Sequence, residues 1–243
     1  MFKADVSKYE KDGYTTNHDS IFSKVFNPAT EEEKDVLKSE VQTYIDNGWK
    51  RGNGKVDPDK PMVCLTFDDG PDIRYTPLLL DGLKERNIRV SFFLLGEKVE
   101  QYPELVERMQ KEGHLVGNHT YHHVQLNKLN ETKAREEILK TNNLIYETTG
   151  VYPLYLRPPF GAWKKNLELC VEMLPVFWTI DTLDWKVQNT EKIVRTVQEQ
   201  IEDGAIILMH DEYDTSVEAA LQVVDELKNQ GYELVTVDQL ILP

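Results

Sequence analysis

The chain contains Met62-Val63-Cys64-Leu65-Thr66-Phe67-Asp68-Asp69-Gly70-Pro71, an apolar run that ends in two acidic residues and a Gly-Pro turn. Such a run is typical of a buried strand, and Gly-Pro marks the point where the chain turns. Asp68 and Asp69 are therefore expected at the carboxyl end of a strand. Paired acids before a turn are also common for conformational reasons alone, so this stretch needs a second feature to indicate chemistry.

Strand-like and helix-like segments alternate from residue 61 onward. We predict strands at 62–67, 90–95, 154–156, 176–180, 205–209 and 233–237, and helices near 77–86, 104–112, 131–148, 191–201 and 216–229. This alternation predicts an α/β fold with a parallel sheet. We favour a closed or nearly closed barrel, because the candidate catalytic residues would then lie at the carboxyl ends of strands, where barrel active sites form.

Residues 1–60 are predicted to be a short helical N-terminal extension, and residues 61–243 the catalytic domain. Residues 1–28 show no sustained period. Thr30 and Glu33 fit a capping box, and helical spacing then predicts one amphipathic helix that ends at Gly48, with Val36, Leu37, Val41, Tyr44 and Ile45 on its apolar face. Residues 51–55 have the composition of a linker.

Histidines are concentrated in one segment, since four of the six lie within ten residues, at positions 114, 119, 122 and 123. His119 and His123 have the i, i+4 spacing that would place two imidazoles on one face of a helical turn. With one Asp they would form a metal site with open positions, as catalysis requires. His122 would lie on another side of the turn, and His114 is expected to be a structural residue before a strand.

The chain resembles carbohydrate esterase family 4, the NodB-like polysaccharide deacetylases, and looks most like the bacterial peptidoglycan N-acetylglucosamine deacetylases among them. The resemblance begins near residue 61 and implies a distorted (β/α)7 barrel, the NodB-homology domain. Five short motifs carry it, in order: Thr66-Phe67-Asp68-Asp69-Gly70, His119-Thr120-Tyr121-His122-His123, Arg157-Pro158-Pro159-Phe160-Gly161, Asp181-Thr182-Leu183-Asp184-Trp185 and Leu208-Met209-His210.

The resemblance implies one divalent ion bound by Asp69, His119 and His123, for which Zn2+ is favoured and Co2+ or Ni2+ are alternatives. Such an ion would polarise an acetyl carbonyl and lower the pKa of a water molecule. Asp68 would be the general base, with a second metal ligand as the alternative. His210 would be the general acid that protonates the leaving amine.

Five further residues would support this chemistry. Arg157 would keep Asp68 ionised and oriented, unless it is a surface arginine before a Pro-Pro turn. Asp184 would pair with His210 and keep its imidazole protonated. Trp185 and Leu208 would form an apolar wall for the acetyl methyl group, with core packing as the alternative. Phe160 stands where the family usually has Tyr, and it can still offer its backbone N–H to an oxyanion.

The implied function is removal of the N-acetyl group from N-acetylglucosamine in peptidoglycan or a chitin-type polymer, with release of acetate. An O-acetyl xylan esterase that uses the same site is the alternative, because an ester does not strictly need His210 as an acid. A carbohydrate-binding pseudoenzyme is disfavoured, since the base, the acid and all three ligands are present.

Composition restricts the partners. The net charge of -14 disfavours nucleic acid, and no apolar run approaches the roughly 20 residues of a membrane span. The first residues contain no apolar segment of a secretory signal. Because the implied substrates lie outside the membrane, we expect an extracellular or cell-surface protein that has lost a leader or anchor, and a monomer. Cys64 and Cys170 are expected to be reduced.

Overall fold

The computed structural model describes residues 22–27, 29–30, 32–37, 39–51, 60–163 and 173–241. The chain divides into two compact units, with the boundary between Asp59 and Lys60. No helix in these described segments has both the length and the apolar character needed to cross a membrane.

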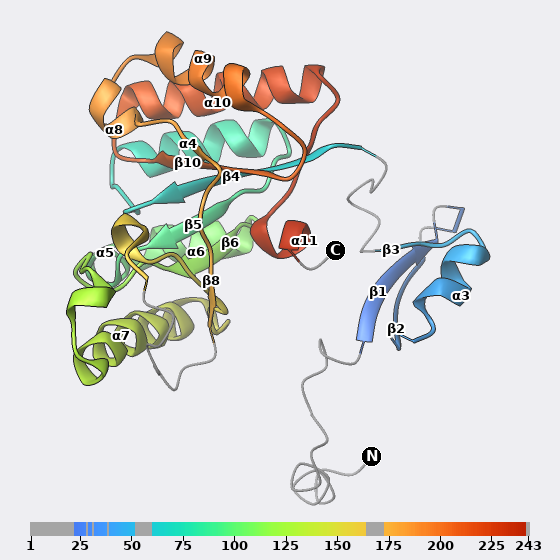
Figure 1. Cartoon of the computed structure of the whole chain (residues 1–243), viewed down its shortest axis with the longest axis horizontal. Helices are drawn as coiled ribbons and strands as arrows, with labels where there is room; N and C mark the ends of the chain where they lie inside the picture. Colours follow the sequence, from blue (N-terminus) through green and yellow to red (C-terminus); the bar gives the residue numbers. More distant parts are fainter. Residues whose placement is uncertain are drawn as a thin grey trace, which may run out of the picture. The chain divides into compact units, whose positions relative to one another are not determined.

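The N-terminal unit contains a small antiparallel sheet (Figure 1). Strand β1 (Phe22–Asn27) lies between β2 (Glu32–Leu37) and β3 (Lys50–Arg51), and helix α3 (Val41–Asp46) precedes β3. A small core forms from the buried side chains of Val25, Val36 and Val41, with Tyr44, Ile45 and Trp49 packed against them.

The prediction of a helical extension is therefore wrong in part. Residues 32–37 form a strand paired with β1, and the helix is confined to α3, because a turn closed by the Glu40 N–H donating to Leu37 O (2.8 Å) separates the two elements. The Thr30 N–H bonds to Asn27 O in the turn between β1 and β2. Residues 22–27, expected to be irregular, are also a strand, while residues 1–21 and the linker at 52–55 lie outside the described residues.

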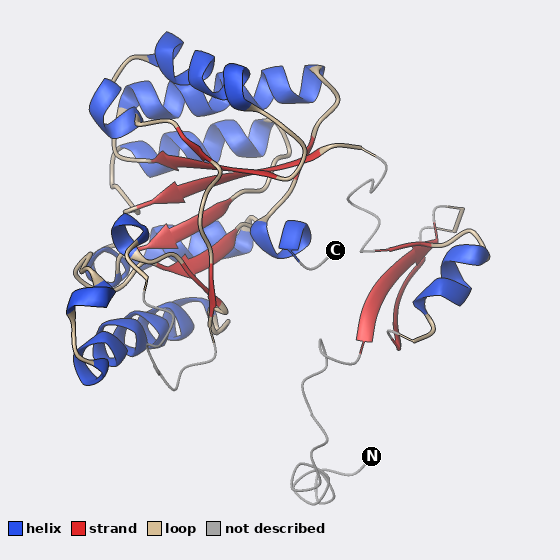
Figure 2. Cartoon of the chain, in the orientation of Figure 1, coloured by secondary structure: helices blue, strands red, loops and turns tan. Residues whose placement is uncertain are grey.

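The main unit is built on an eight-stranded sheet in which every recorded strand pair is parallel. The strand order is β8-β7-β6-β5-β4-β10-β9, and β11 pairs with the first residues of β4. The strands are β4 (Met62–Asp68), β5 (Ser91–Leu94), β6 (Leu115–Asn118), β7 (Tyr155–Leu156), β8 (Leu174–Pro175), β9 (Ile180–Asp181), β10 (Ala205–His210) and β11 (Glu233–Leu234). The sheet curls as an incomplete barrel: among the described residues, no hydrogen-bonded pairing joins its end strands, β8 and β9 (Figure 2).

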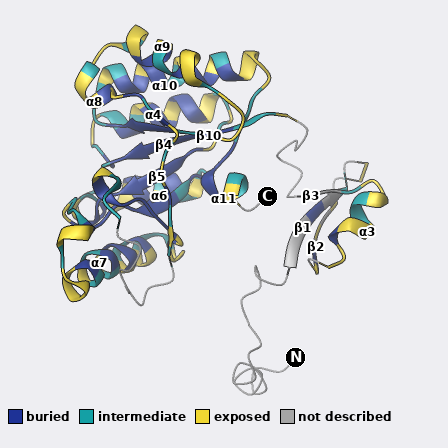
Figure 3. Cartoon of the chain, viewed as in Figure 1, coloured by how far each residue is buried: buried dark blue, intermediate teal, exposed yellow. Residues whose placement is uncertain are grey.

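Helices cover the outside of this sheet. They are α4 (Tyr75–Glu85), α5 (Gly96–Gln101), α6 (Pro103–Lys111), α7 (Glu131–Thr149), α8 (Asp184–Val187), α9 (Thr190–Gln200), α10 (Asp214–Asn229) and α11 (Val237–Ile241). The buried residues lie along the strands and on the inward sides of the helices (Figure 3). For example, Leu79, Leu80 and Leu83 of α4 are fully buried against Phe67 and its neighbours in the same core.

The predicted α/β fold and distorted barrel are confirmed, and the five predicted helices of this unit occur within two residues of the expected bounds. The differences concern short elements. Strand β9 covers Ile180–Asp181 instead of 176–180, Val237 starts α11 instead of ending a strand, and β8, α5 and α8 were not predicted. Cys64 is a free, fully buried thiol whose pKa burial raises to about 12, while Cys170 lies outside the described residues.

Candidate metal centre and active site

The candidate site lies at the carboxyl ends of β4, β6 and β10. Asp68 ends β4 and is in register with His210, which ends β10. Asn118 ends β6, and His119 follows it directly. Because parallel strands bring their carboxyl ends to one edge of the sheet, three motifs that are far apart in sequence meet there.

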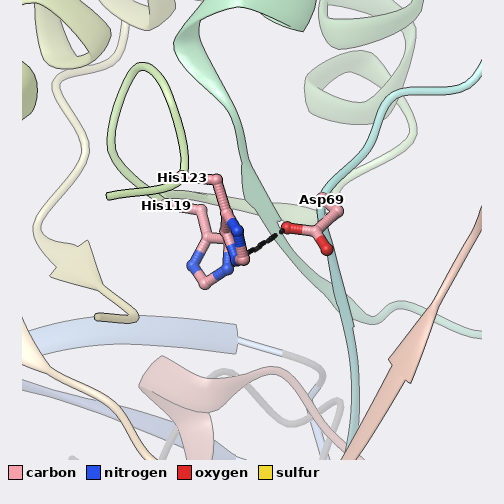
Figure 4. Close-up of side chains that lie close together, drawn as sticks. All are labelled: Asp69, His119 and His123. Carbon is pink, nitrogen blue, oxygen red and sulfur yellow. Dashed lines mark ion pairs between the residues drawn. The ribbon is translucent and has the colours of Figure 1, made fainter. Parts of the chain in front are cut away.

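Asp69, His119 and His123 form a compact group of possible metal ligands (Figure 4). Asp69 Oδ1 lies 3.3 Å from His119 Nε2 and 3.4 Å from His123 Nε2, and one ligand atom from each residue lies within 4.8 Å of the others. Asp69 Oδ1 is buried and makes no hydrogen bond. A buried carboxylate oxygen without a partner is costly, and a cation held between it and the two imidazoles would satisfy it.

The protonation states of these residues also fit a cation. Burial by itself would raise the pKa of Asp69, but contact with the His119 imidazole and the charges of His119, His123 and His210 bring the pKa well below its ordinary value. His119 Nδ1 lies 2.7 Å from the backbone carbonyl of Arg157. Since that carbonyl can only accept, Nδ1 carries the proton and Nε2 keeps its lone pair for a metal.

The two imidazoles are not brought together by a helical turn, so that prediction is wrong. Residues 119–123 form an irregular loop in which Thr120 (φ 67°) and His123 (φ 53°) are left-handed. This conformation places the His119 and His123 rings with their centroids 5.0 Å apart. His122 points elsewhere, as expected, and its Nδ1 lies 2.8 Å from Glu137 Oε1.

His114 has the structural role predicted for it. The side chain is buried directly before β6, packs edge-on against Phe92, and its Nδ1 accepts a hydrogen bond from the Val90 N–H (3.1 Å). Burial lowers the pKa of His114 to about 4. It is therefore neutral at physiological pH.

Arg157 and Asp68 form a buried ion pair beside the metal ligands. Arg157 Nη1 donates to Asp68 Oδ1 (2.7 Å) and to Thr66 Oγ1 (2.7 Å), and the guanidinium lies over the Phe93 ring. Arg157 is fully buried, which excludes the alternative of a surface arginine. Burial lowers the pKa of Arg157, and the Asp68 carboxylate opposes that shift. The second oxygen of Asp68, Oδ2, lies 3.7 Å from His119 Nε2 and so faces the metal ligands.

Asp184 and His210 form a second buried pair near Asp69. Asp184 Oδ1 lies 2.8 Å from His210 Nδ1, and Asp184 Oδ2 accepts the His210 backbone N–H (2.8 Å). Burial would lower the pKa of His210, but the hydrogen bond and charge of Asp184, together with Asp68 and Asp69, raise it to about 9. Because Nδ1 is held by Asp184, the protonated imidazole presents its Nε2–H to the site, 3.8 Å from Asp69 Oδ2.

The three predicted substrate-binding residues differ in burial. Phe160 is 62% exposed in a left-handed conformation (φ 59°), and its ring centroid lies 4.5 Å from that of His123. Trp185, on α8, is 49% exposed and so is not a core residue. Leu208 is 5% exposed and precedes His210 by two positions on β10, which puts both side chains on one face of the strand.

Two polar residues of this region were not predicted. Glu137 of α7 binds the histidine loop, and Asp211, directly after His210, is buried and accepts a hydrogen bond from Thr76 Oγ1. Burial raises the pKa of Asp211 to about 7. A Cβ on Gly70 would lie 2.4 Å from Asp211 Oδ1, which explains why glycine follows the two acids. The sequence pattern does not indicate the contact of Glu137 with the histidine loop or that of Asp211 with Thr76, because both depend on tertiary packing.

Known proteins are similar to this chain in sequence and in fold. The sequence profile of the family described as polysaccharide deacetylase matches residues 55–176. The peptidoglycan-N-acetylglucosamine deacetylase PgdA of Listeria monocytogenes is 38% identical over 206 residues, which cover 85% of this chain and 44% of PgdA. The peptidoglycan-N-acetylmuramic acid deacetylase PdaC of Bacillus subtilis is 39% identical over 223 residues, covering 85% of this chain and 47% of PdaC.

The chain thus spans less than half the length of these two relatives. A solved structure of PdaC superposes with a TM-score of 0.74 and 42% identity, covering 76% of this chain and 92% of that structure. The matched profile, the relatives and the shared fold show that the chain belongs to the polysaccharide deacetylases of carbohydrate esterase family 4.

Proposed function

We propose that the chain is a metal-dependent hydrolase that removes the N-acetyl group from N-acetylglucosamine residues of a polysaccharide and releases acetate. The observation that carries this proposal is that two buried charge pairs, Arg157–Asp68 and Asp184–His210, approach a possible metal trio to 3.7 Å and 3.8 Å. An acid and a base beside an electrophile-binding centre are what acyl transfer to water needs.

Asp69, His119 and His123 would hold one divalent ion, and Zn2+ suits one carboxylate and two imidazoles, with Co2+ or Ni2+ as alternatives. When bound, the ion would polarise the acetyl carbonyl and lower the pKa of the attacking water. Asp68 then serves as the general base. Its Oδ1 is occupied by Arg157, so Oδ2, which faces the ligands, is the oxygen available to accept the proton.

His210 serves as the general acid. Its raised pKa keeps Nε2 protonated at neutral pH, and the leaving amine of an amide needs that proton to depart. Leu208 and the exposed Trp185 would receive the acetyl methyl group. Because Phe160 has no hydroxyl, we assign it a backbone N–H donor role only.

Peptidoglycan is the favoured polymer, since PgdA and PdaC are both named as peptidoglycan deacetylases. PgdA is named for N-acetylglucosamine and PdaC for N-acetylmuramic acid. Action on peptidoglycan implies an extracellular or cell-surface location. We assign the chemistry to residues 61–243 and expect the chain to work as a monomer, because every residue invoked lies in the main unit.

The test is acetate release from peptidoglycan, chitin oligosaccharides and acetylated xylan, measured with metal-stripped and Zn2+-reloaded protein. We expect activity on the amide substrates that depends on reloading. In His210→Ala, amide cleavage should fall by about 10²–10⁴-fold, whereas ester cleavage should fall less. Acetate release from xylan alone would instead identify an O-acetyl esterase.

A further inference from the structure

The loop from His119 to His123 carries two of the three proposed metal ligands in a conformation that needs support. Thr120 and His123 both have positive φ, a backbone conformation that is unfavourable for non-glycine residues. Such residues persist only where the surrounding structure holds them. The contacts that hold this loop therefore determine where the two imidazoles lie.

Glu137, on α7, makes three of these contacts. Its Oε2 accepts the backbone N–H groups of Tyr121 (3.1 Å) and His122 (2.9 Å), and its Oε1 lies 2.8 Å from His122 Nδ1. The Glu137 side chain is only 16% exposed, although His122, which it contacts, is exposed. One carboxylate thus binds the two residues at the centre of the loop.

Helix α5 binds the carbonyl groups of the same loop. The Gly96 N–H donates to Thr120 O (3.0 Å) and the Glu97 N–H donates to Tyr121 O (3.3 Å). The Tyr121 ring packs where a Cβ on Gly96 would lie. Glu137 thus accepts two N–H groups of the loop and α5 donates to two of its carbonyls, so the loop is bound from α5 and from α7.

We propose that Glu137 is a positioning residue for the metal site, which sets the separation of His119 and His123 through the loop backbone. The proposal rests on the metal site proposed above. Without Glu137, the N–H groups of Tyr121 and His122 lose their protein acceptor and the loop can relax from its left-handed conformations. The imidazoles would then no longer be held at a distance suited to one ion, and loss of such supporting contacts typically lowers metal affinity about 10–100-fold.

The experiment is a Zn2+ affinity measurement on the full chain, by competition with a chromophoric chelator, with thermal unfolding of the metal-free protein as the check on folding. Glu137→Ala should bind Zn2+ about 10–100-fold more weakly. Glu137→Gln removes the same charge, but its amide oxygen can accept both N–H groups and its NH2 can donate to His122 Nδ1. It should therefore stay within about threefold of the natural protein. Glu136→Ala, at an exposed neighbouring position, and His122→Ala, which keeps both backbone bonds, are matched controls that should change little.

Equal Zn2+ affinity in Glu137→Ala and the natural protein would overturn the proposal. So would equal losses in Glu137→Ala and Glu137→Gln, because the carboxylate would then act by charge alone. If Glu137→Ala does not fold, Glu137→Asp decides, since it keeps the charge but shortens the reach: weaker binding supports the proposal and unchanged binding refutes it. Asp69→Asn separates this inference from the proposed function, because loss of Zn2+ in that variant shows the metal site stands whatever Glu137 does.

Discussion

The Asp184–His210 pair gives a direct test of the proposed acid. The perturbation is Asp184→Asn, which keeps the size of a fully buried side chain while removing its charge. In the native protein both Asp184 oxygens bind His210, one at Nδ1 and one at the backbone N–H. An asparagine offers one oxygen for these two donors and no negative charge to stabilise an imidazolium.

The direction and size of the effect follow from the pKa of His210. That pKa is raised from 6.5 to about 9 although burial opposes the shift, and Asp184 supplies the hydrogen bond and the leading charge. With Asp68 and Asp69 still present, the pKa in Asp184→Asn should fall by about two units, equivalent to about 2.7 kcal/mol. Since the protonated imidazole is the active form, activity should be lost at a correspondingly lower pH.

The assay is the pH dependence of kcat/KM for acetate release from a chitin oligosaccharide, from about pH 6 to about pH 10. The alkaline limb of Asp184→Asn should lie about two pH units below that of the natural protein. Asp181→Asn is the control, because that carboxylate, near the same strand end, accepts the Leu183 N–H instead (2.9 Å). An alkaline limb in Asp184→Asn that stays in place or rises would refute the assignment of His210 as the acid.

Three further predictions concern the metal, the base and the buried histidine. Chelation should abolish activity, and His119→Ala and His123→Ala should each lose the one divalent ion per chain that elemental analysis should find in the natural protein; unchanged metal content would contradict the ligand set. Asp68→Asn should lose nearly all turnover while retaining metal, whereas Asp69→Asn should lose both, and equal metal retention in the two variants would mean that their roles are misassigned. His114 has a pKa of about 4 when folded and 6.5 when unfolded, so it should remove about 2 kcal/mol of stability between pH 7 and pH 5, as the unfolded chain takes up the proton first. Urea unfolding in the presence of a chelator should therefore show a flatter pH dependence for His114→Asn, and an identical dependence would show that His114 does not titrate as inferred.

The strands of the main unit were predictable where a continuous apolar run was long enough to indicate a buried strand. The runs at 62–67 and 205–209 have almost no polar residues, and both are central strands, because strands covered on both faces by other elements need apolar side chains throughout. The N-terminal unit was not predictable in this way. Residues 32–37 combine four charged residues with Val36 and Leu37, and their pairing with β1 depends on contacts outside the segment.

The candidate site shows the same division. The residues proposed to carry chemistry stand in short motifs and lie together in the structure, but the backbone conformation that arranges them was not predicted. The spacing of His119 and His123 is compatible with a helix as well as with the observed loop. Nothing in the residue types at positions 120 and 123 indicates that their backbones are left-handed. Glu137 lies 14 residues after His123 on a helix rich in charged residues, where sequence alone does not distinguish it from Glu136.

The register between β4 and β10 fixes one part of the site, whereas the connecting segments can vary in sequence. Asp68 and His210 are register partners on adjacent parallel strands, so the sheet itself sets the distance between the proposed base and the proposed acid. Phe160 and Trp185, by contrast, stand on connections outside these two strands. Connections of this kind can be exchanged or lengthened without altering the pairing of Asp68 with His210. Under the roles proposed above, the parts of the site that would contact the acetyl group can therefore vary while the spacing of the proposed base and acid is kept.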